Sequence, residues 1–389
     1  MSDVHLLFLV LAALYVWECT CWLRRGSVAF VTWLGSNWRT VHPGALAGNP
    51  TGGFILAAPL PPLGTLLIAN QLPLSLSPEG VLAFVVTNVN PGWRPAQSGC
   101  FARWENLNDV RVRGKKLLIN GGPFLIAATP GLARHLCAKL QRLVKLSRAD
   151  REVAITEMLR ATFDGRAILT RLAEHQTRSR TVMRWLANGL FLYLVVMVPG
   201  LIWHFGFSRT WLALLLGLLA LTITTATLFG HAHRALYPAA GDERFTHTLT
   251  IALAPTSALR AHDALSRPLL ENFHPLAVAQ QLLPEEAFRR FARRVMLDLR
   301  HPARPWGTSE RPEVVTTEAF SRSVLQSAAE AFLQQYGLSP DEVGRAPAPT
   351  DDSCRSYCPR CDAQFTTRTG TCGDCGGLPV MELRGDTGN

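Results

Sequence analysis

Two apolar runs near the middle of the chain decide its fold: WLANGLFLYLVVMVPGLIWHF at residues 185–205 and WLALLLGLLALTITTATLF at residues 211–229. Each is close to the roughly 20 residues that an α-helix needs to cross the core of a bilayer. The short interval between them has room only for a tight turn. The sequence therefore predicts a transmembrane helical hairpin over residues 185–231.

Proline and small residues predict how this hairpin packs. Pro199 lacks a backbone N–H and, with Gly200, predicts a kink in the first helix, which a neighbouring helix makes tolerable. Ala213 and Gly217 lie four residues apart on the second helix, where small residues let two backbones approach closely.

A third span is predicted at the N-terminus, where residues 5–23 read HLLFLVLAALYVWECTCWL. Arg24 and Arg25 follow this run, whereas no Lys or Arg precedes it, which is the reverse of a cleaved signal peptide. By the positive-inside rule the N-terminus faces outward, and residues 1–25 form a membrane anchor. Arg184 and Arg234 flank the hairpin and place both of its ends in the cytoplasm.

The composition agrees with a membrane protein that carries soluble parts. Of 389 residues, 48% are hydrophobic and 17% are charged, against about 25% charged residues in soluble domains. Disorder is excluded as the dominant state, and nine cysteines are too few for a disulfide scaffold of this length. Only four of the 39 basic residues are lysine, an excess of arginine that indicates a GC-rich bacterial genome. We therefore expect a multi-pass protein of the bacterial inner (cytoplasmic) membrane with its main domains and C-terminus in the cytosol.

Between the first span and the hairpin, residues 45–147 predict a cytosolic β-rich domain. Short apolar runs such as GVLAFVV and KLLIN alternate with turn residues, and a helix follows with Thr129 as its N-cap. This order of elements resembles a pleckstrin-homology domain, although the closing helix lacks the family's Trp. The early loop around residues 59–64 also lacks basic residues, so phosphoinositide binding is not supported. A small β domain of another type remains the alternative.

Residues 148–184 predict a basic helical stalk directly before the hairpin. From Arg134 to Arg184, twelve basic residues stand against five acidic ones. This excess indicates either a solvated helix face or a surface attracted to anionic lipid, which contributes about 1 kcal/mol per basic residue near the membrane. Nucleic acid is the less favoured partner because no nucleic-acid-binding signature accompanies the charge.

After the hairpin, residues 232–338 predict a cytosolic helical region. The segment EEAFRRFARRVMLDLR places Phe288, Phe291 and Val295 on one face, which favours core packing over an interfacial membrane helix. A further helix is expected to begin after Thr316. The Pro- and Asp-rich residues 339–353 then predict a flexible linker.

The C-terminal residues 354–389 hold the specific chemical motif of the chain. Two CxxC pairs, separated by ten residues, supply Cys358, Cys361, Cys372 and Cys375. Four thiolates can surround one Zn²⁺ tetrahedrally and supply the folding energy that such a short segment lacks. An iron site, and disulfides or redox thiols, are the alternatives, and a reducing cytosol disfavours disulfides. Cys354 is expected to be a bystander.

The two CxxC pairs resemble those of a zinc ribbon, the rubredoxin-like module, although the ten-residue spacer between them is shorter than usual. The resemblance implies a small β-hairpin module with a closed, structural zinc site. As a whole, the chain is similar to bacterial integral membrane proteins of uncharacterised function that end in such a ribbon.

Weaker constellations concern histidines and isolated charges. His231, His233 and His247 suggest a metal or proton site, but no carboxylate at helical spacing completes a ligand set. Glu18 lies inside the first span, where snorkelling toward the interface explains it as well as a functional role does.

The densest polar group runs from Arg260 to His274 and includes His262, Asp263 and Arg267. It predicts either an acid–base site or, preferably, a helix whose polar residues face water. No nucleophile, zinc-protease or Walker motif occurs in the chain.

The sequence favours a membrane-anchored cytosolic scaffold or adaptor whose zinc ribbon binds a protein partner. The alternative is a membrane-associated enzyme that uses the Arg260–His274 group. Transport ranks third, since three helices enclose no pathway without oligomerisation.

Overall fold

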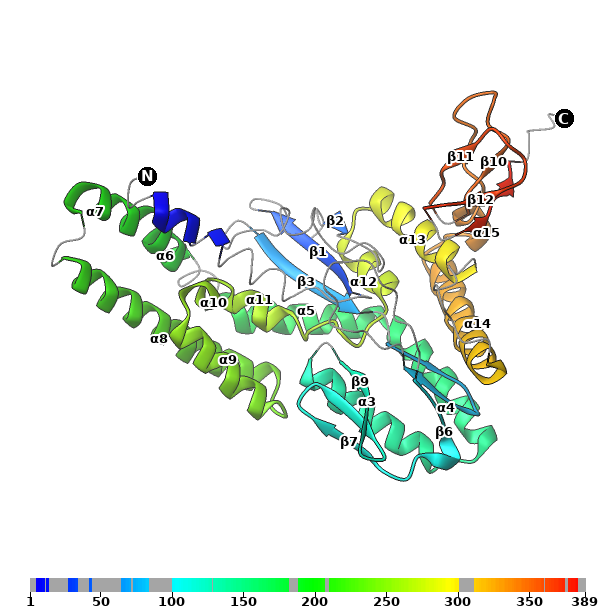
Figure 1. The fold of residues 1–389 in the computed structure, drawn as a ribbon, viewed down its shortest axis with the longest axis horizontal. Helices are drawn as coiled ribbons and strands as arrows, with labels where there is room; N and C mark the ends of the chain where they lie inside the picture. The colour runs from blue at the N-terminus through cyan, green and yellow to red at the C-terminus, as the bar shows by residue number, and fades with distance from the viewer. Residues whose placement is uncertain are drawn as a thin grey trace. The chain divides into compact units, whose positions relative to one another are not determined.

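The fold is taken from a computed structural model, which describes residues 5–10, 12–13, 27–33, 42–43, 64–70, 73–83, 100–127, 129–181, 188–206, 210–300, 311–359, 361–374 and 377–383 (Figure 1). Most of the first predicted span, including Glu18, and the predicted ligand Cys375 lie outside these residues. The chain divides into two compact units. Unit 1 comprises Met1–Gln71, Ala128–Leu132 and Gly165–Leu283, and unit 2 comprises Leu72–Ala127, Ala133–Asp164 and Pro284–Asn389.

The apolar runs of the predicted hairpin are helical in unit 1. The first run holds α6 (Asn188–Phe191), a π-helical turn (Leu192–Met197) and α7 (Val198–Phe205), and the second holds α8 (Thr210–Leu236). Among the described residues, Trp211–Leu236 is the one helix both long and apolar enough to cross a membrane, and Gly189–Phe205 is a shorter apolar helix. One candidate span is therefore shown, whereas the three predicted spans are not.

Close packing joins the two apolar runs at Gly217. The Tyr193 hydroxyl donates a hydrogen bond to the Leu214 carbonyl at 2.6 Å. A Cβ at Gly217 would lie 2.6 Å from the same hydroxyl oxygen, closer than real contacts allow. The prediction that Gly217 permits close approach is thus confirmed, whereas Ala213 is exposed.

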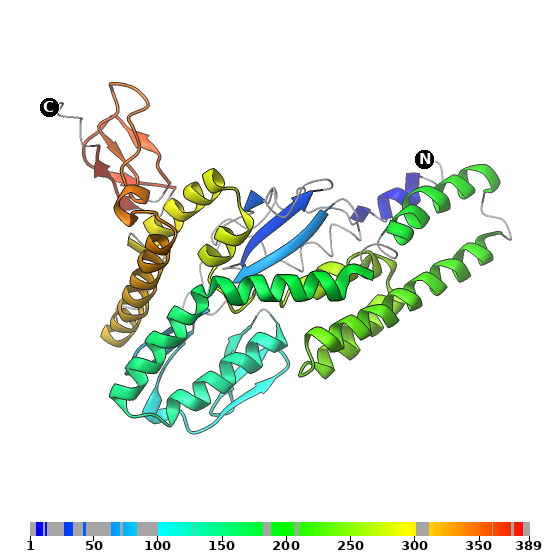
Figure 2. The ribbon, with the colours of Figure 1, turned by 180° about the vertical axis from the view of Figure 1, so that it is seen from behind.

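Helices after α8 complete the apolar core of unit 1. They are α9 (Gly241–Leu253), α10 (Pro255–Leu259), α11 (Ala261–Ser266) and α12 (Pro275–Leu282), and α5 (Gly165–Thr181) precedes the hairpin. Figure 2 shows α9 folded back beside α8. Leu190, Phe229, Ile251 and Leu265 lie in one buried cluster, which ties α6, α8, α9 and α11 together.

A three-stranded antiparallel sheet also belongs to unit 1. Its order is β2–β1–β3, with β1 at Ser27–Trp33, β2 at His42–Pro43 and β3 at Gly64–Asn70. Val28, Phe30 and Leu67 are buried, and both α11 and α12 pack against β3. The sheet therefore forms one wall of the core into which α11 is packed.

Residues 72–127 of unit 2 contain two further three-stranded antiparallel sheets among their described residues. The first is β4 (Leu74–Leu76), β5 (Gly80–Ala83) and β6 (Cys100–Arg103), and a short 3-10 helix (Trp104–Asn106) follows it. The second is β7 (Val110–Arg113), β8 (Lys116–Ile119) and β9 (Gly122–Ile126). Within the described residues the apolar runs predicted as strands form strands, whereas the predicted run at residues 54–60 lies outside them. The strands fall into separate sheets, and a pleckstrin-homology barrel is not shown.

The helices of unit 2 pack on one another and, in part, on these sheets. They are α3 (Pro130–Val144), α4 (Arg148–Arg160), a 3-10 turn (Ala161–Phe163), α13 (Glu285–Arg300), α14 (Pro312–Gln335) and α15 (Pro340–Val343). Thr129 Oγ1 accepts the Leu132 N–H at 3.0 Å, so the predicted N-cap of α3 is confirmed. Phe288, Phe291 and Val295 of α13 are buried, which confirms core packing for that face.

The C-terminal residues form two small antiparallel sheets. In the first, β10 (Ser356–Tyr357) lies between β11 (Gln364–Phe365) and β14 (Met381–Glu382). In the second, β12 (Thr371–Cys372) pairs with β13 (Leu378–Pro379). The described cysteines Cys358, Cys361 and Cys372 thus lie in or beside two β-hairpins.

Candidate metal centre

Two tight turns position the described cysteines. Cys358 follows β10, and its N–H donates to the Ala363 carbonyl at 2.8 Å, while the Asp362 N–H returns to the Cys358 carbonyl at 3.0 Å. In the second hairpin the Gly377 N–H donates to the Cys372 carbonyl at 2.9 Å, and Gly377 has a φ of +80°. The glycine conformation closes this turn, since the left-handed region is open to residues without a Cβ.

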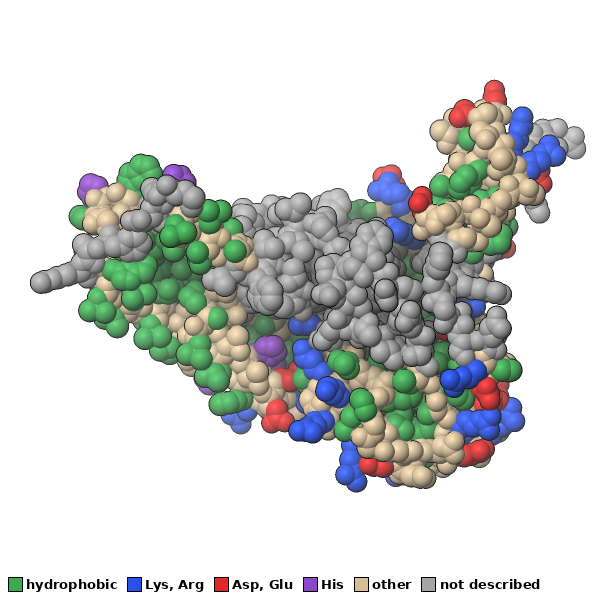
Figure 3. Space-filling view, viewed as in Figure 1, with side chains coloured by type: hydrophobic (Ala, Val, Ile, Leu, Met, Phe, Trp, Pro, Cys, Tyr) green, Lys and Arg blue, Asp and Glu red, His purple; other side chains and the backbone are tan. Residues whose placement is uncertain are grey.

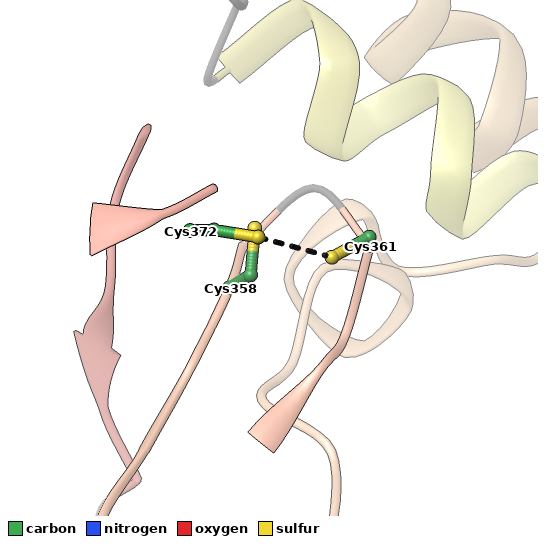
Figure 4. A group of neighbouring side chains, drawn as sticks. All are labelled: Cys358, Cys361 and Cys372. Carbon is green, nitrogen blue, oxygen red and sulfur yellow. Dashed lines mark hydrogen bonds between the residues drawn. The ribbon is translucent and has the colours of Figure 1, made fainter. Parts of the chain in front are cut away.

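The three thiols converge as metal ligands do. The Sγ atoms of Cys358, Cys361 and Cys372 all lie within 4.8 Å of one another and point toward a common centre (Figure 4). The separation between the Cys361 and Cys372 sulfurs is 3.7 Å. A tetrahedral site with Zn–S bonds of about 2.3 Å requires sulfurs about 3.8 Å apart, whereas a disulfide requires about 2.05 Å. The spacing therefore fits metal ligation and not a disulfide.

The donor set is chemically suited to a soft or borderline metal ion. Thiolate sulfurs select Zn²⁺, Cu(I) and iron over Mg²⁺ or Ca²⁺. Cys358 and Cys372 are buried and Cys361 is exposed, so the cluster lies at the surface of its module. Within the part of the chain that the structure describes, this is the group of His, Cys and carboxylate side chains close enough to hold a metal ion. Cys354 lies apart from it and donates to Asp351 Oδ1 at 3.6 Å.

The apolar core around the cluster is very small. The partly buried hydrophobic residues packed against the cysteines are Ala363, Phe365 and Leu378. A core of this size does not offset the conformational entropy of ordering some thirty residues at about 1–2 kcal/mol each. Metal ligation would supply the missing folding free energy.

An ion pair fixes the first turn to α13 within unit 2. Arg293 Nε and Nη2 donate to the two carboxylate oxygens of Asp362, each at 2.9 Å, and Arg293 Nη1 donates to the Arg345 carbonyl. Bidentate pairs of this kind are the strong, geometrically specific form of the salt bridge. Asp362 itself has a φ of +61°, an uncommon conformation outside glycine.

The segment predicted as a flexible linker contributes to this attachment. Arg300 lies 3.3 Å from Asp341 of α15, and Gln364 donates to the Ala348 carbonyl at 2.7 Å. The Gln364 side-chain oxygen also accepts the Thr350 N–H at 2.7 Å. Residues 339–353 are therefore hydrogen-bonded to both α13 and the metal module.

The second candidate site, the Arg260–His274 group, is buried in unit 1. Arg260 and Asp263 form an ion pair at 2.9 Å, and each side chain is 1% exposed. His262 of α11 meets His175 of α5 edge to face, with ring centroids 5.1 Å apart. The interpretation of a water-facing polar helix is therefore wrong, because α11 is enclosed between α5, α8 and β3.

Burial keeps the histidines of this group neutral. It lowers the pKa of His175 to about 4 and that of His274 to about 3, and it lowers the pKa of His262 well below 6.5, with His175 adding to the effect. His274 Nδ1 accepts the Leu276 N–H at 3.2 Å and so caps α12. The sequence did not indicate His175, which lies 87 residues before His262 and on a different helix.

Two buried carboxylates lie at the start of α3. Thr129 Oγ1 donates to Glu271 Oε2 at 2.6 Å. A Cβ built on Gly131 would lie 3.3 Å from Glu271 and 3.5 Å from Glu243, so both carboxylates approach the same backbone. No sequence spacing relates these residues, and sequence analysis missed them.

The histidines at the end of α8 do not form a ligand set among the described residues. His231 is exposed, whereas His233 is buried in a ring cluster with Phe229 and Tyr237. The His233 and His247 ring centroids are 6.5 Å apart. This geometry indicates aromatic packing between α8 and α9.

We compared the chain with protein-family models, with curated proteins and with solved structures, and none of them matches.

Proposed function

We propose that the protein is a membrane-anchored cytosolic scaffold or adaptor whose C-terminal zinc ribbon binds a protein partner. The observation that carries this proposal is the combination, in one chain, of the apolar helix Trp211–Leu236 with a thiol cluster that is fixed to a helical unit. The helix supplies location, and the module supplies a rigid surface.

The membrane part of the proposal comprises three spans in the bacterial inner membrane, with the N-terminus outside. The cluster of Val198, Ile202 and Leu214, which joins α7 to α8, also receives Leu7 from the first apolar run. Large side chains on α8, including Leu212, Leu216 and Ile223, are exposed, which suits contact with lipid. The arginine-rich flanks support cytosolic domains.

The metal part assigns Zn²⁺ to Cys358, Cys361, Cys372 and Cys375 as a closed structural site. The 3.7 Å sulfur separation and the very small core support this assignment. In this proposal Cys375 provides the fourth thiolate, so no coordination position remains open for substrate.

Anionic lipid is the proposed partner of the basic stalk. Arg166, Arg171, Arg178 and Arg180 of α5 are all exposed, on the helix that leads into the first apolar run of the hairpin. Their proximity in sequence to a span makes attraction to an anionic leaflet favourable.

Affinity purification from detergent extracts tests the scaffold. The wild-type protein is expected to recover a stoichiometric cytosolic protein, and deletion of residues 354–389 or a Cys358→Ser variant is expected to lose it. Cys354→Ser is the matched control, since this thiol lies outside the cluster. Recovery of the same partner by all variants would remove the ribbon from the proposal.

A membrane-associated enzyme is the second candidate, favoured by the buried Arg260–Asp263 pair beside two neutral histidines. Such perturbed groups concentrate at functional sites as well as in structural networks. The enzyme predicts that His262→Gln abolishes complementation of a deletion strain while thermal unfolding stays at the wild-type temperature. If the variant loses both thermal stability and complementation, the Arg260–His274 group has a structural role in the core.

A further inference from the structure

Helix α9 exposes a stripe of large apolar side chains. Phe245, Leu249 and Leu253 are 71%, 49% and 73% exposed, and their four-residue spacing places them on one face. The charges of α9 are confined to its first turn at residues 242–244, and residues 245–259 read FTHTLTIALAPTSAL without a charged side chain. A helix in water normally directs its polar face outward, so this exposed face needs an apolar environment.

The register with α8 places this stripe beside the candidate membrane span. The helices are antiparallel, with Thr248 Oγ1 3.4 Å from a Cβ built on Gly230. At about 1.5 Å per residue, Leu249 lies level with Phe229 and Leu253 lies about 6 Å further along, toward the centre of α8. The charged first turn of α9 correspondingly lies level with the end of α8 near Leu236. The apolar parts of both helices therefore lie in the same layer.

Polar groups on this face are satisfied within the helix. Thr246 Oγ1 donates to the Asp242 carbonyl at 3.0 Å, and Thr250 Oγ1 donates to the Thr246 carbonyl at 2.8 Å. The exposed hydroxyls of α8 do the same, as in the 2.8 Å bond from Thr224 to the Ala220 carbonyl. Surfaces in contact with hydrocarbon need such internal pairing, because no water is present there to accept the hydrogen bonds.

The chain stays in this layer as it turns into α10. The Ala254 N–H donates to the Thr250 carbonyl at 2.9 Å, Pro255 has no N–H, and the Ala258 N–H donates to the Ala254 carbonyl at 3.0 Å. Ala258 and Leu259 then enter the buried cluster that contains Leu190 of α6. The turn thus packs against a helix of the predicted hairpin, which is where non-helical backbone is tolerated at membrane depth.

We propose that α9 is a re-entrant helix embedded in the leaflet at the Leu236 end of α8, with Phe245, Leu249 and Leu253 against lipid acyl chains. This inference rests on the proposed membrane anchor and extends it, since residues 232–338 were expected to be wholly cytosolic. The apolar surface of α9 is continuous with that of α8, where hydrophobic side chains gather in the space-filling view (Figure 3). An uncharged stretch of this length is too short to span and is typical of re-entrant or interfacial segments.

Photocrosslinking in a bilayer tests the placement without altering the protein. Full-length protein is reconstituted into phosphatidylcholine–phosphatidylglycerol nanodiscs that contain an acyl-chain diazirine lipid, and adducts are mapped by mass spectrometry. Adducts are expected on Phe245, Leu249 and Leu253 at yields comparable with Leu216 of α8. Val315, an exposed apolar residue of α14, provides the background yield.

The outcomes separate this inference from the proposed function. Adducts on α8 with only background on α9 would overturn the re-entrant placement and leave the anchor standing. Background on both helices would overturn the anchor and the inference together.

A variant pair provides a second readout. Leu249→Glu is expected to lower the adduct yield on α9 severalfold while the yield on α8 is retained, because a carboxylate is costly in hydrocarbon. Val153→Glu, at an exposed position of α4, is expected to leave both yields unchanged. Unchanged α9 labelling in Leu249→Glu would overturn the proposed lipid contact.

Discussion

Acidification should weaken unit 1 through His175, and the size of the effect follows from its burial. His175 is fully buried on α5 against His262, and burial lowers its pKa from 6.5 to about 4. The unfolded chain therefore binds a proton below pH 6.5 that the folded protein does not bind until about pH 4. The contribution of His175 to the free energy of unfolding is thus fully present above pH 6.5 and is lost as the pH falls toward 4. At pH 5 the loss from this residue is about 2 kcal/mol.

The assay compares pH dependence in three proteins. Hydrogen exchange of the α5 backbone is measured in nanodiscs between pH 7.5 and pH 5, corrected for intrinsic exchange rates. His175→Gln cannot take up the proton, so its free energy of opening should fall by about 2 kcal/mol less than that of wild type. His231→Gln is the control, because that side chain is exposed on α8 and should leave the wild-type dependence unchanged.

The result that would refute this reasoning is a His175→Gln protein whose α5 loses protection with the wild-type pH dependence. Burial of a neutral imidazole would then not be the source of acid sensitivity.

Three further predictions concern packing and the metal module. Gly217→Ala puts a Cβ 2.6 Å from a tyrosine hydroxyl and should cost about 1–3 kcal/mol, seen as a lower unfolding temperature in nanodiscs. Cys372→Ser or a zinc chelator should abolish exchange protection over residues 354–383, with mass spectrometry reporting less than one bound metal ion. Arg293→Ala should raise exchange over residues 361–365 while one metal ion stays bound, since it removes docking and not ligation.

Each has a matched control. Gly200→Ala meets nothing within 4 Å and should not lower the unfolding temperature, so equal losses in both glycine variants would contradict the packing argument. Cys354→Ser should retain the protection that Cys372→Ser loses. Metal loss in Arg293→Ala would show that docking and ligation are not separable.

Local signals in the sequence predicted local structure correctly. Residues close together in the sequence were enough to predict the Thr129 cap and the apolar face of α13. The same is true of the strands from β3 to β9. The separation of the strands into several sheets was not predictable, because strand pairing depends on partners that no periodicity identifies.

The buried polar group shows where reasoning from sequence failed. The run from Arg260 to His274 is dense in charge and looks solvent-facing when taken alone. Its burial depends on His175 of α5 and on strand β3 at residues 64–70, and both lie far away in the sequence. Paired charges can be buried when an ion pair compensates desolvation, and Arg260 and Asp263 form such a pair within the run itself. The distant elements that cover this pair were not visible in the sequence.

For the metal module, spacing alone indicated the cysteines, and three of the four predicted ligands are brought together by the described residues. Its attachment to α13 was missed, because Arg293 and Asp362 are 69 residues apart. A Pro- and Asp-rich composition suggested free movement, whereas hydrogen bonds to the carbonyls of Arg345 and Ala348 hold that segment.

The backbone of Asp362 has a consequence for how this module can evolve. A non-glycine residue in the left-handed region carries a conformational penalty of about 1 kcal/mol that glycine would avoid. Turn geometry alone therefore favours glycine at this position. The ion pair with Arg293 is what favours aspartate there. A lineage that no longer needs the ribbon held against α13 can exchange this aspartate for glycine, relax the knuckle and release the module, without altering any metal ligand.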